Sequence, residues 1–199
     1  MTEKTDKNKV DQSQTDQTLE AVKELLTRHG IRRTSMNDIA EAAGVSRQTL
    51  YSRFESKEGI LRAVIFYSTD QTIGSVKDEW RSCESVADKL DVFFRHAIIT
   101  TYELMETMPD AADLFAAEHP MVSEAIQDCE KKYTQLVRSM LLPCTDILKE
   151  RGETPASVAS LITTTGYAMK HNATSVTDLN KKLLTLRRMV ALTVGEEAG

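Results

Sequence analysis

The chain has little cysteine, proline and glycine, and it has no long apolar run. Its 199 residues include 3 Cys, 4 Pro and 8 Gly, and 41% are hydrophobic. The cysteines are odd in number and far apart, so we expect free thiols rather than a disulfide framework. No run of apolar residues reaches the ~18 that a membrane-spanning helix needs. The first 18 residues lack the apolar core of a signal peptide. These absences favour a cytoplasmic protein.

Signatures of catalysis and metal binding are also missing from the sequence. The four histidines lack metal-type spacings such as HxxxH or HExxH, and they are His29, His96, His119 and His171. No GxSxG, GxGxxG or GxxxxGK[ST] motif occurs. We therefore expect no enzyme activity, no catalytic residues, no cofactor and no bound metal.

Positive charge is concentrated in one short segment of an acidic chain. The whole chain has a formal net charge of −5, whereas residues 28–62 carry seven basic and four acidic side chains. That local excess indicates a phosphate-facing module joined to an acidic body. The alternative is an ordinary fluctuation of surface charge.

Apolar spacing predicts helices throughout and no strands. Residues 1–15 are polar and non-periodic, which predicts a disordered arm. A helix follows from Leu19, and Ser35 and Ser46 are placed to cap two short helices joined at Gly44. This arrangement predicts a helix-turn-helix domain over 16–62. Further helices are expected over 56–80, 85–108, 110–118, 121–151, 155–171 and 177–194. The fold class is therefore all-α with about nine helices, in which a second helical domain covers 63–199.

A dense motif lies within Met36–Glu55 and continues to Leu61. Its residues are Ile39-Ala40-x-x-Ala43-Gly44-Val45-Ser46, then Thr49-Leu50-Tyr51-x-x-Phe54-x-x-Lys57-Glu58. Ala40 permits close crossing of the two helices, and Gly44 permits the turn between them. The motif resembles the TetR family of bacterial transcription regulators. The resemblance covers less than a quarter of the chain.

The resemblance implies a two-domain, all-α homodimer whose N-terminal module binds a palindromic operator. Binding of a small molecule to the C-terminal domain would then release the DNA, as in a ligand-responsive repressor. The positions implied to contact DNA are Ser35, Asn37, Ser46, Arg47, Gln48, Thr49, Tyr51, Arg53 and Lys57. Arg and Gln side chains match guanine and adenine edges, respectively, in the major groove. Structural alternatives are core packing for Tyr51, a solvated charge for Arg53 and a plain helix start for Lys57.

The C-terminal helices predict an interface between two copies of the chain. Apolar residues cover more than one face of 177–194, so this helix must meet both its own core and something else. The small residues Ala159, Thr163 and Gly166 permit close approach along 155–171. A four-helix bundle across a two-fold axis is the expected homodimer contact. The alternative is burial of both faces within one subunit.

The sequence gives little information about which residues line the effector pocket. Clustered Met and aromatic residues indicate an apolar or aromatic ligand. Candidate lining residues are Phe93, His96, Tyr102, Met105, Met108, Phe115 and Tyr133, and each of them is equally compatible with an ordinary core position.

Two other functions are compatible with the sequence. One is a DNA-binding protein without an inducer, such as an activator or a chromosome-organising protein. The other is a helical enzyme or small-molecule-binding protein with a look-alike hairpin.

Overall fold

Every regular element of the described structure is helical, which confirms the all-α prediction. The computed structural model describes residues 3–109 and 120–197, with side chains from residue 13 onward. The N-terminal helices are α1 (Glu3–His29), α2 (Met36–Ala42), α3 (Arg47–Phe54) and α4 (Lys57–Trp80). They are followed by α5 (Val86–Phe93), the π-helical segment η1 (Phe94–Ile99), α6 (Thr100–Thr107), α8 (Pro120–Leu141), the 3-10 segment η2 (Leu142–Cys144), α9 (Thr145–Glu150), α10 (Pro155–His171) and α11 (Val176–Thr193).

Several predicted boundaries differ from the observed ones for local reasons. Helix α1 begins at Glu3, so most of the predicted arm is the N-terminal part of a helix. This segment has no Pro or Gly and contains Glu, Lys and Gln, which favour helix. The predicted helix 121–151 is divided because Pro143 lacks a backbone N–H, and α8 ends at Leu141. The predicted helix 110–118 lies outside the described residues.

The chain divides into two compact units. The first contains residues 1–69 and 105–127, and the second contains 70–104 and 128–199. The sequence instead predicts a boundary at 62/63, without the return of 105–127 to the first unit. In the first unit, Leu26, Ile39, Leu50 and Ile60 share one buried cluster, so α1 to α4 have a common core.

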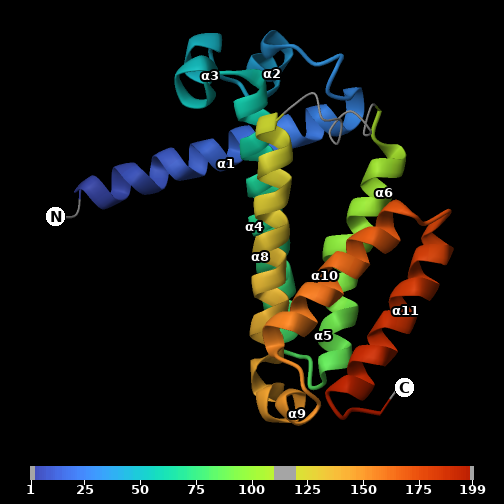
Figure 1. Cartoon of the computed structure of the whole chain (residues 1–199). Helices are drawn as coiled ribbons and strands as arrows, with labels where there is room; N and C mark the ends of the chain where they lie inside the picture. The colour runs from blue at the N-terminus through green and yellow to red at the C-terminus, as the bar shows by residue number, and fades with distance from the viewer. Residues whose placement is uncertain (1–2, 110–119, 198–199) are drawn as a thin grey trace. The chain divides into compact units, whose positions relative to one another are not determined.

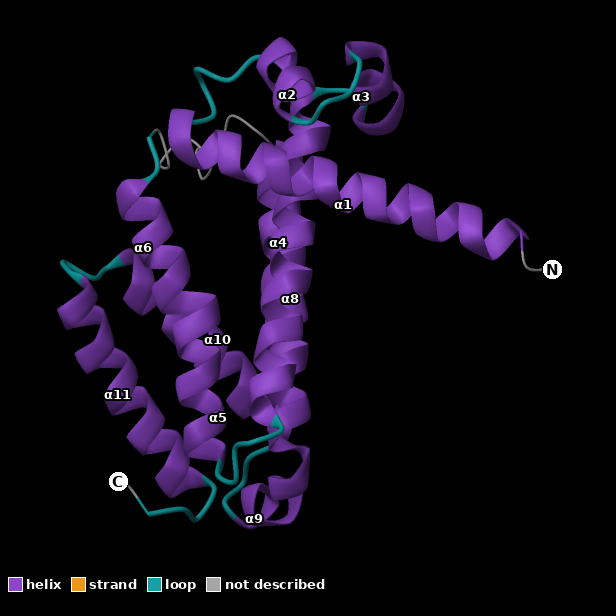
Figure 2. Ribbon diagram, turned by 180° about the vertical axis from the view of Figure 1, so that it is seen from behind, coloured by secondary structure: helices purple, strands orange, loops and turns teal. Residues whose placement is uncertain are grey.

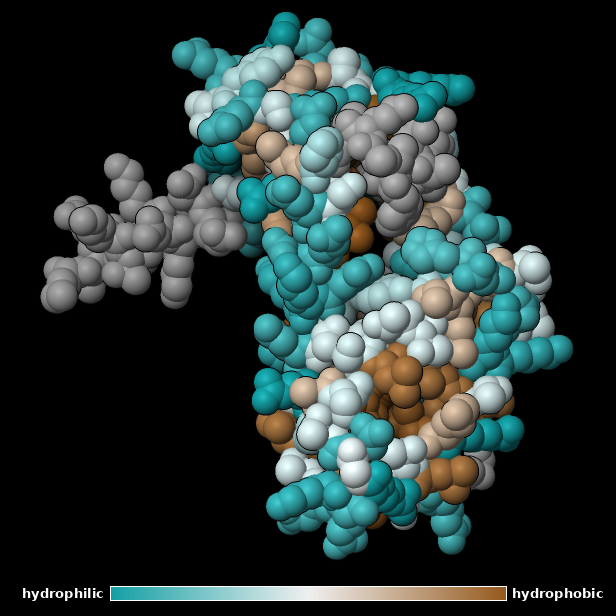
Figure 3. All heavy atoms as spheres, viewed as in Figure 1, coloured by the Kyte–Doolittle hydropathy of each residue, from teal (hydrophilic) through white to brown (hydrophobic). Residues whose placement is uncertain are grey.

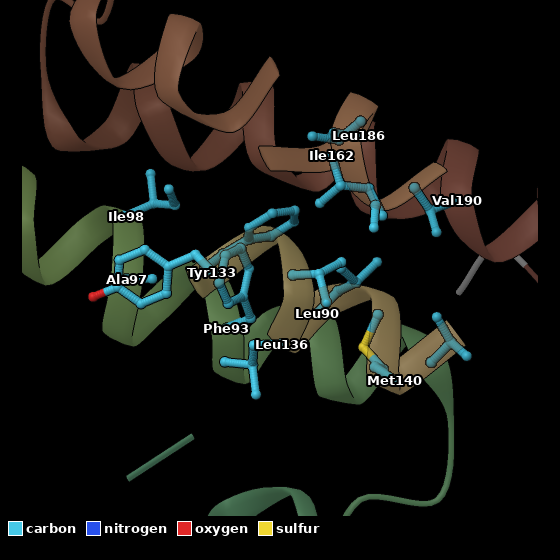
Figure 4. Close-up of a cluster of buried hydrophobic side chains, with 14 of the residues drawn as sticks. Leu90, Phe93, Ala97, Ile98, Tyr133, Leu136, Met140, Ile162, Leu186 and Val190 are labelled. Carbon is cyan, nitrogen blue, oxygen red and sulfur yellow. The ribbon is translucent and has the colours of Figure 1, made fainter. Parts of the chain in front are cut away.

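The second unit has a separate hydrophobic core. Leu90 and Phe93 of α5, Leu136 of α8, Ile162 of α10 and Leu186 of α11 belong to it (Figure 4). Helix α11 packs on α5 and on α10, and α10 also packs on η1 (Figure 2). None of the helices within residues 3–109 and 120–197 combines the length and the hydropathy of a membrane span.

Candidate nucleic-acid interface

Helix α2 begins with a complete capping box, as predicted. The Ser35 hydroxyl accepts from the Asp38 backbone N–H, and the Asp38 carboxylate accepts from the Ser35 backbone N–H at 2.8 Å. The side-chain hydrogen bond from Ser35 lowers the pKa of Asp38, and the backbone hydrogen bond lowers it further. The capping interaction is therefore fully present above the ordinary aspartate pKa and weakens as the pH falls below it.

The turn between α2 and α3 sets the direction of α3 relative to α2 (Figure 1). Gly44 has φ +64°, a conformation that costs other L-residues energy. The Val45 backbone N–H donates to the Ala40 carbonyl at 3.0 Å and closes the turn. Ile39 and Leu50 are fully buried on either side of it. These positions confirm the predicted helix-turn-helix packing.

The first turn of α3 presents polar side chains to solvent. The Ser46 hydroxyl accepts from the Thr49 backbone N–H at 3.1 Å and caps the helix. Arg47 and Gln48 are exposed, and Tyr51 has 43% of its surface exposed. The Arg47 guanidinium lies 5.9 Å from the centre of the Tyr51 ring. The exposure of Tyr51 contradicts the alternative in which its ring fills the core.

The other predicted DNA-contacting residues differ in how available they are. Asn37 is exposed on α2. Thr49 is half-buried, and its hydroxyl lies 2.9 Å from that of Ser46. Arg53 is half-buried near the C-terminal end of α3, so it is not a fully solvated charge. Thus Arg47, Gln48 and Tyr51 form the exposed group on α3, which we call the α3 face.

Lys57 has a structural contact that the sequence does not predict. Its ammonium group donates to the Ile31 carbonyl in the loop after α1. This hydrogen bond ties the loop carrying exposed Arg32 and Arg33 to the start of α4. Lys57 is therefore more than a plain helix-start residue, and its ammonium group has two further protons for a phosphate.

A strained turn joins α3 to α4. Glu55 has φ 63° and ψ −45°, and the Ser56 backbone N–H donates to the Phe54 carbonyl at 2.6 Å. This is a γ-turn of the rare, strained kind. Gly59 lies directly against the same carbonyl, because a Cβ at this position would overlap Phe54 O. Gly59 was not among the predicted residues, although a glycine so soon after a helix end signals close approach of two backbones.

The strain at Glu55 predicts a substitution that stabilises the protein. Glu55→Gly should raise the free energy of unfolding by about 1 kcal/mol, because glycine adopts positive φ without steric cost. This gain is the relieved strain energy minus the free-energy cost of the extra conformational entropy that glycine gives to the unfolded chain. Urea unfolding followed by circular dichroism measures it. Glu41→Gly, at an exposed position within α2, is the matched control and should destabilise by about 1 kcal/mol. Equal destabilisation by both variants would contradict the strained turn.

The predicted pocket residues do not form one group. Phe93, Tyr102 and Tyr133 belong to the core of the second unit, and the rings of Phe93 and Tyr133 are 6.0 Å apart. His96 instead lies 3.5 Å from the Glu79 carboxylate. Met105 falls in the first unit, as does Met108, which packs on the core of that unit. Phe115 lies outside the described residues. Three of the seven residues therefore share one cluster.

The surface of α10 and α11 is unusually apolar. Leu161 and Met189 each have 62% of their surface exposed, and Leu192 has 55%. Together with Leu184, they form what we call the α10–α11 face, and Figure 3 shows a hydrophobic patch in this region of the second unit. The small residues Ala159, Thr163 and Gly166 are buried instead, and the Cβ position of Gly166 lies 3.6 Å from Ile98. They permit close packing within the subunit, which corrects their predicted place in the interface between copies.

The described residues contain no candidate cluster for metal binding. Among them, no group of three or more His, Cys, Asp and Glu side chains is placed to hold a metal ion.

Comparison with known proteins places residues 19–64 in a defined family. They match the model described as bacterial regulatory proteins, tetR family. An uncharacterised helix-turn-helix transcriptional regulator of Mycobacterium tuberculosis is 30% identical over 107 residues, covering 54% of this chain and 51% of the relative. The repressor ComR of Escherichia coli is 42% identical over 50 residues, covering 25% and 24%. The chain thus spans about half the length, or less, of these curated relatives.

Solved structures extend the likeness of fold to almost the whole chain. A crystal structure of a TetR-family regulator from Rhodococcus sp. superimposes with a TM-score of 0.68 at 18% identity. The alignment covers 91% of this chain and 98% of that one. At this identity the similarity concerns the fold.

Proposed function

Because the chain belongs to the TetR family of bacterial regulatory proteins, we propose that it is a transcriptional repressor released from DNA by a small molecule. It binds a palindromic operator as a homodimer through α3. The observation that carries this proposal is the α3 face, where Arg47, Gln48 and Tyr51 are exposed on a capped helix.

The α3 face has the chemistry that base and phosphate recognition requires. Arg47 can pair bidentately with guanine, and Gln48 with adenine. The Tyr51 hydroxyl can donate to a phosphate, and the Arg47 guanidinium lies over the Tyr51 ring. Ser35 and Ser46 lie at helix N-termini, where free backbone N–H groups favour phosphate. Asn37, Thr49, Arg53 and Lys57 are proposed as supporting contacts to phosphate or bases.

Substitutions on the α3 face test the proposed function. Arg47→Ala should weaken binding to the operator about 5- to 150-fold, which corresponds to about 1–3 kcal/mol for a bidentate base contact. Tyr51→Phe should weaken it about fivefold through loss of one phosphate hydrogen bond. Fluorescence anisotropy measures both, with DNA from upstream of the protein's own gene and a scrambled fragment.

Arg81→Ala is the matched control, since it removes the same charge from an exposed site in the second unit. Equal loss of affinity for Arg47→Ala and Arg81→Ala would contradict direct recognition by α3. If Arg47→Ala weakened binding to the scrambled fragment as much as binding to the operator, Arg47 would contact phosphate and no base.

The homodimer is proposed to form through residues 155–171 and 177–194. The α10–α11 face supports this part of the proposal, because contiguous exposed apolar side chains mark interaction surfaces. Two copies joined by a two-fold axis would present two α3 helices to the two halves of a palindrome.

A further inference from the structure

Two polar groups lie side by side near the C-terminal end of α10 in the second unit. The Tyr167 hydroxyl is inaccessible to solvent and has no hydrogen-bond partner among the described residues. Lys170, one helical turn further along α10, has only 7% of its surface exposed. Its ammonium nitrogen lies 5.2 Å from the centre of the Tyr167 ring. Lysine is almost never buried to this degree unless it is paired.

No carboxylate in the described chain lies within ion-pair distance of Lys170. Burial lowers the pKa of Lys170, while the negative charge of Glu130 on α8 raises it. Glu130 is thus near enough to act through space without forming a bridge. For Tyr167, burial raises the pKa, and Tyr133 and Glu130 raise it further. The Tyr167 hydroxyl is therefore a buried donor without a partner, and the mostly buried Lys170 side chain lies beside it.

Secondary-structure requirements do not explain this arrangement. A lysine in the last turn of a helix does complement the helix dipole, but an exposed side chain serves that purpose equally well. A tyrosine hydroxyl buried without a partner costs about 1–3 kcal/mol. Phenylalanine would fill the same space without that cost. A buried polar group without a hydrogen-bond partner, such as the Tyr167 hydroxyl, requires an explanation of its own.

The surroundings of the two donors are apolar and aromatic. Tyr167 packs against the core cluster that contains Phe93 and Tyr133. Nearby, the hydroxyls of Thr134 and Thr163 lie 2.9 Å apart and satisfy each other. One ammonium and one phenol beside an apolar cluster match an apolar molecule that carries a single negative charge. A phosphate dianion would require more donors and more positive charge than this site offers.

We propose that the effector of this regulator is an amphipathic carboxylic acid, whose carboxylate accepts from the Tyr167 hydroxyl and the Lys170 ammonium. Its apolar body lies against the aromatic cluster of the second unit. This inference rests on the proposed function in assigning the molecule the role of effector. The predicted pocket residues Phe93 and Tyr133 then contact the apolar body, and the polar recognition comes from two residues that the sequence did not indicate.

Matched pairs of small molecules test this inference on the full-length protein. The probes are decanoate with 1-decanol, and 4-phenylbutyrate with 4-phenyl-1-butanol. Isothermal titration calorimetry should give at least tenfold tighter binding for one acid than for its alcohol. Lys170→Met should abolish that preference, and Tyr167→Phe should reduce it about fivefold. Glu130→Gln should tighten binding of the acid, because it removes a nearby like charge.

Two controls separate binding from folding. Tyr167→Phe should keep or raise the thermal midpoint of the free protein, since it removes a hydroxyl without a partner. Lys149→Met removes an exposed charge from α9 and should leave binding of the acid unchanged. Equal affinity for acid and alcohol in both pairs, absence of binding by either acid, or an unchanged preference in Lys170→Met would overturn the proposal.

Calorimetry needs no DNA, so this inference and the proposed function fail separately. Selective DNA binding without a preference for the acids would contradict only the proposal of a carboxylate effector. Preferential binding of an acid without any DNA binding would contradict the proposed repressor function and would still support the binding site at Tyr167 and Lys170.

Discussion

Gly59→Ala should destabilise the protein by about 3 kcal/mol or more, a large effect for the addition of one methyl group. The new Cβ would overlap the Phe54 carbonyl oxygen, which is backbone and cannot rotate away. The same carbonyl accepts the Ser56 N–H in the strained turn at Glu55, so it has little freedom to move. Urea unfolding followed by circular dichroism measures the loss.

Gly74→Ala is the matched control for this prediction, because both glycines lie on α4. The Cβ position of Gly74 has nothing within 4 Å and the residue is exposed. Alanine there should stabilise the helix by about 0.5–1 kcal/mol. The two substitutions should therefore have opposite signs. Stabilisation by both would mean that α3 and α4 do not approach as closely as the structure has them.

Placing charge on the α10–α11 face should dissociate the homodimer. The double variant Leu161→Glu, Met189→Glu introduces four carboxylates into one two-fold interface, two from each copy. Sedimentation velocity should change from the mass of two chains to that of one. Affinity for the operator should fall at least 100-fold, because one α3 helix binds half of the site.

Leu142→Glu provides the matched control for the dimer prediction. Leu142 is also exposed, at 53%, but it lies in η2 and outside the α10–α11 face. This variant should remain a dimer with unchanged affinity for the operator. A double variant that stays dimeric would place the interface elsewhere, and one that becomes monomeric yet binds DNA normally would contradict the two-fold account of recognition.

Local signals explain which parts of the fold could be predicted from sequence. Thr154 followed by Pro155 marks a helix start, and α10 occupies the predicted residues. The capping pair Ser35 and Asp38 marks α2 in the same way. By contrast, η1 interrupts the predicted helix 85–108 without any Pro or Gly. A π-helical turn adds one residue to a turn while the apolar pattern continues, so spacing alone does not reveal it.

The predicted sites depend on packing that the sequence does not contain. Exposure of Tyr51 follows from its place on α3, whereas both exposure and burial were compatible with the motif. In the sequence, Lys170 is an ordinary basic residue of the last turn of a helix, and only the fold shows that its side chain is mostly buried beside Tyr167. Met108 matches an effector pocket by composition, yet it packs on the core of the first unit. The division of the chain into units, with 105–127 joining the N-terminal helices, decides such cases.

Selection of binding sites from a random double-stranded DNA library tests whether a pair of α3 helices recognises a palindrome, and it requires no knowledge of the operator. The full-length protein is incubated with the library at ~150 mM salt, and the bound DNA is recovered, amplified and sequenced over several rounds. We expect enrichment of one inverted repeat, with half-sites about one helical turn apart. Arg47→Ala, selected in parallel, should lose the preference at the base pairs that Arg47 reads. Recovery of no enriched sequence, or of a single site without a repeat, would contradict recognition of a palindromic operator by a pair of α3 helices.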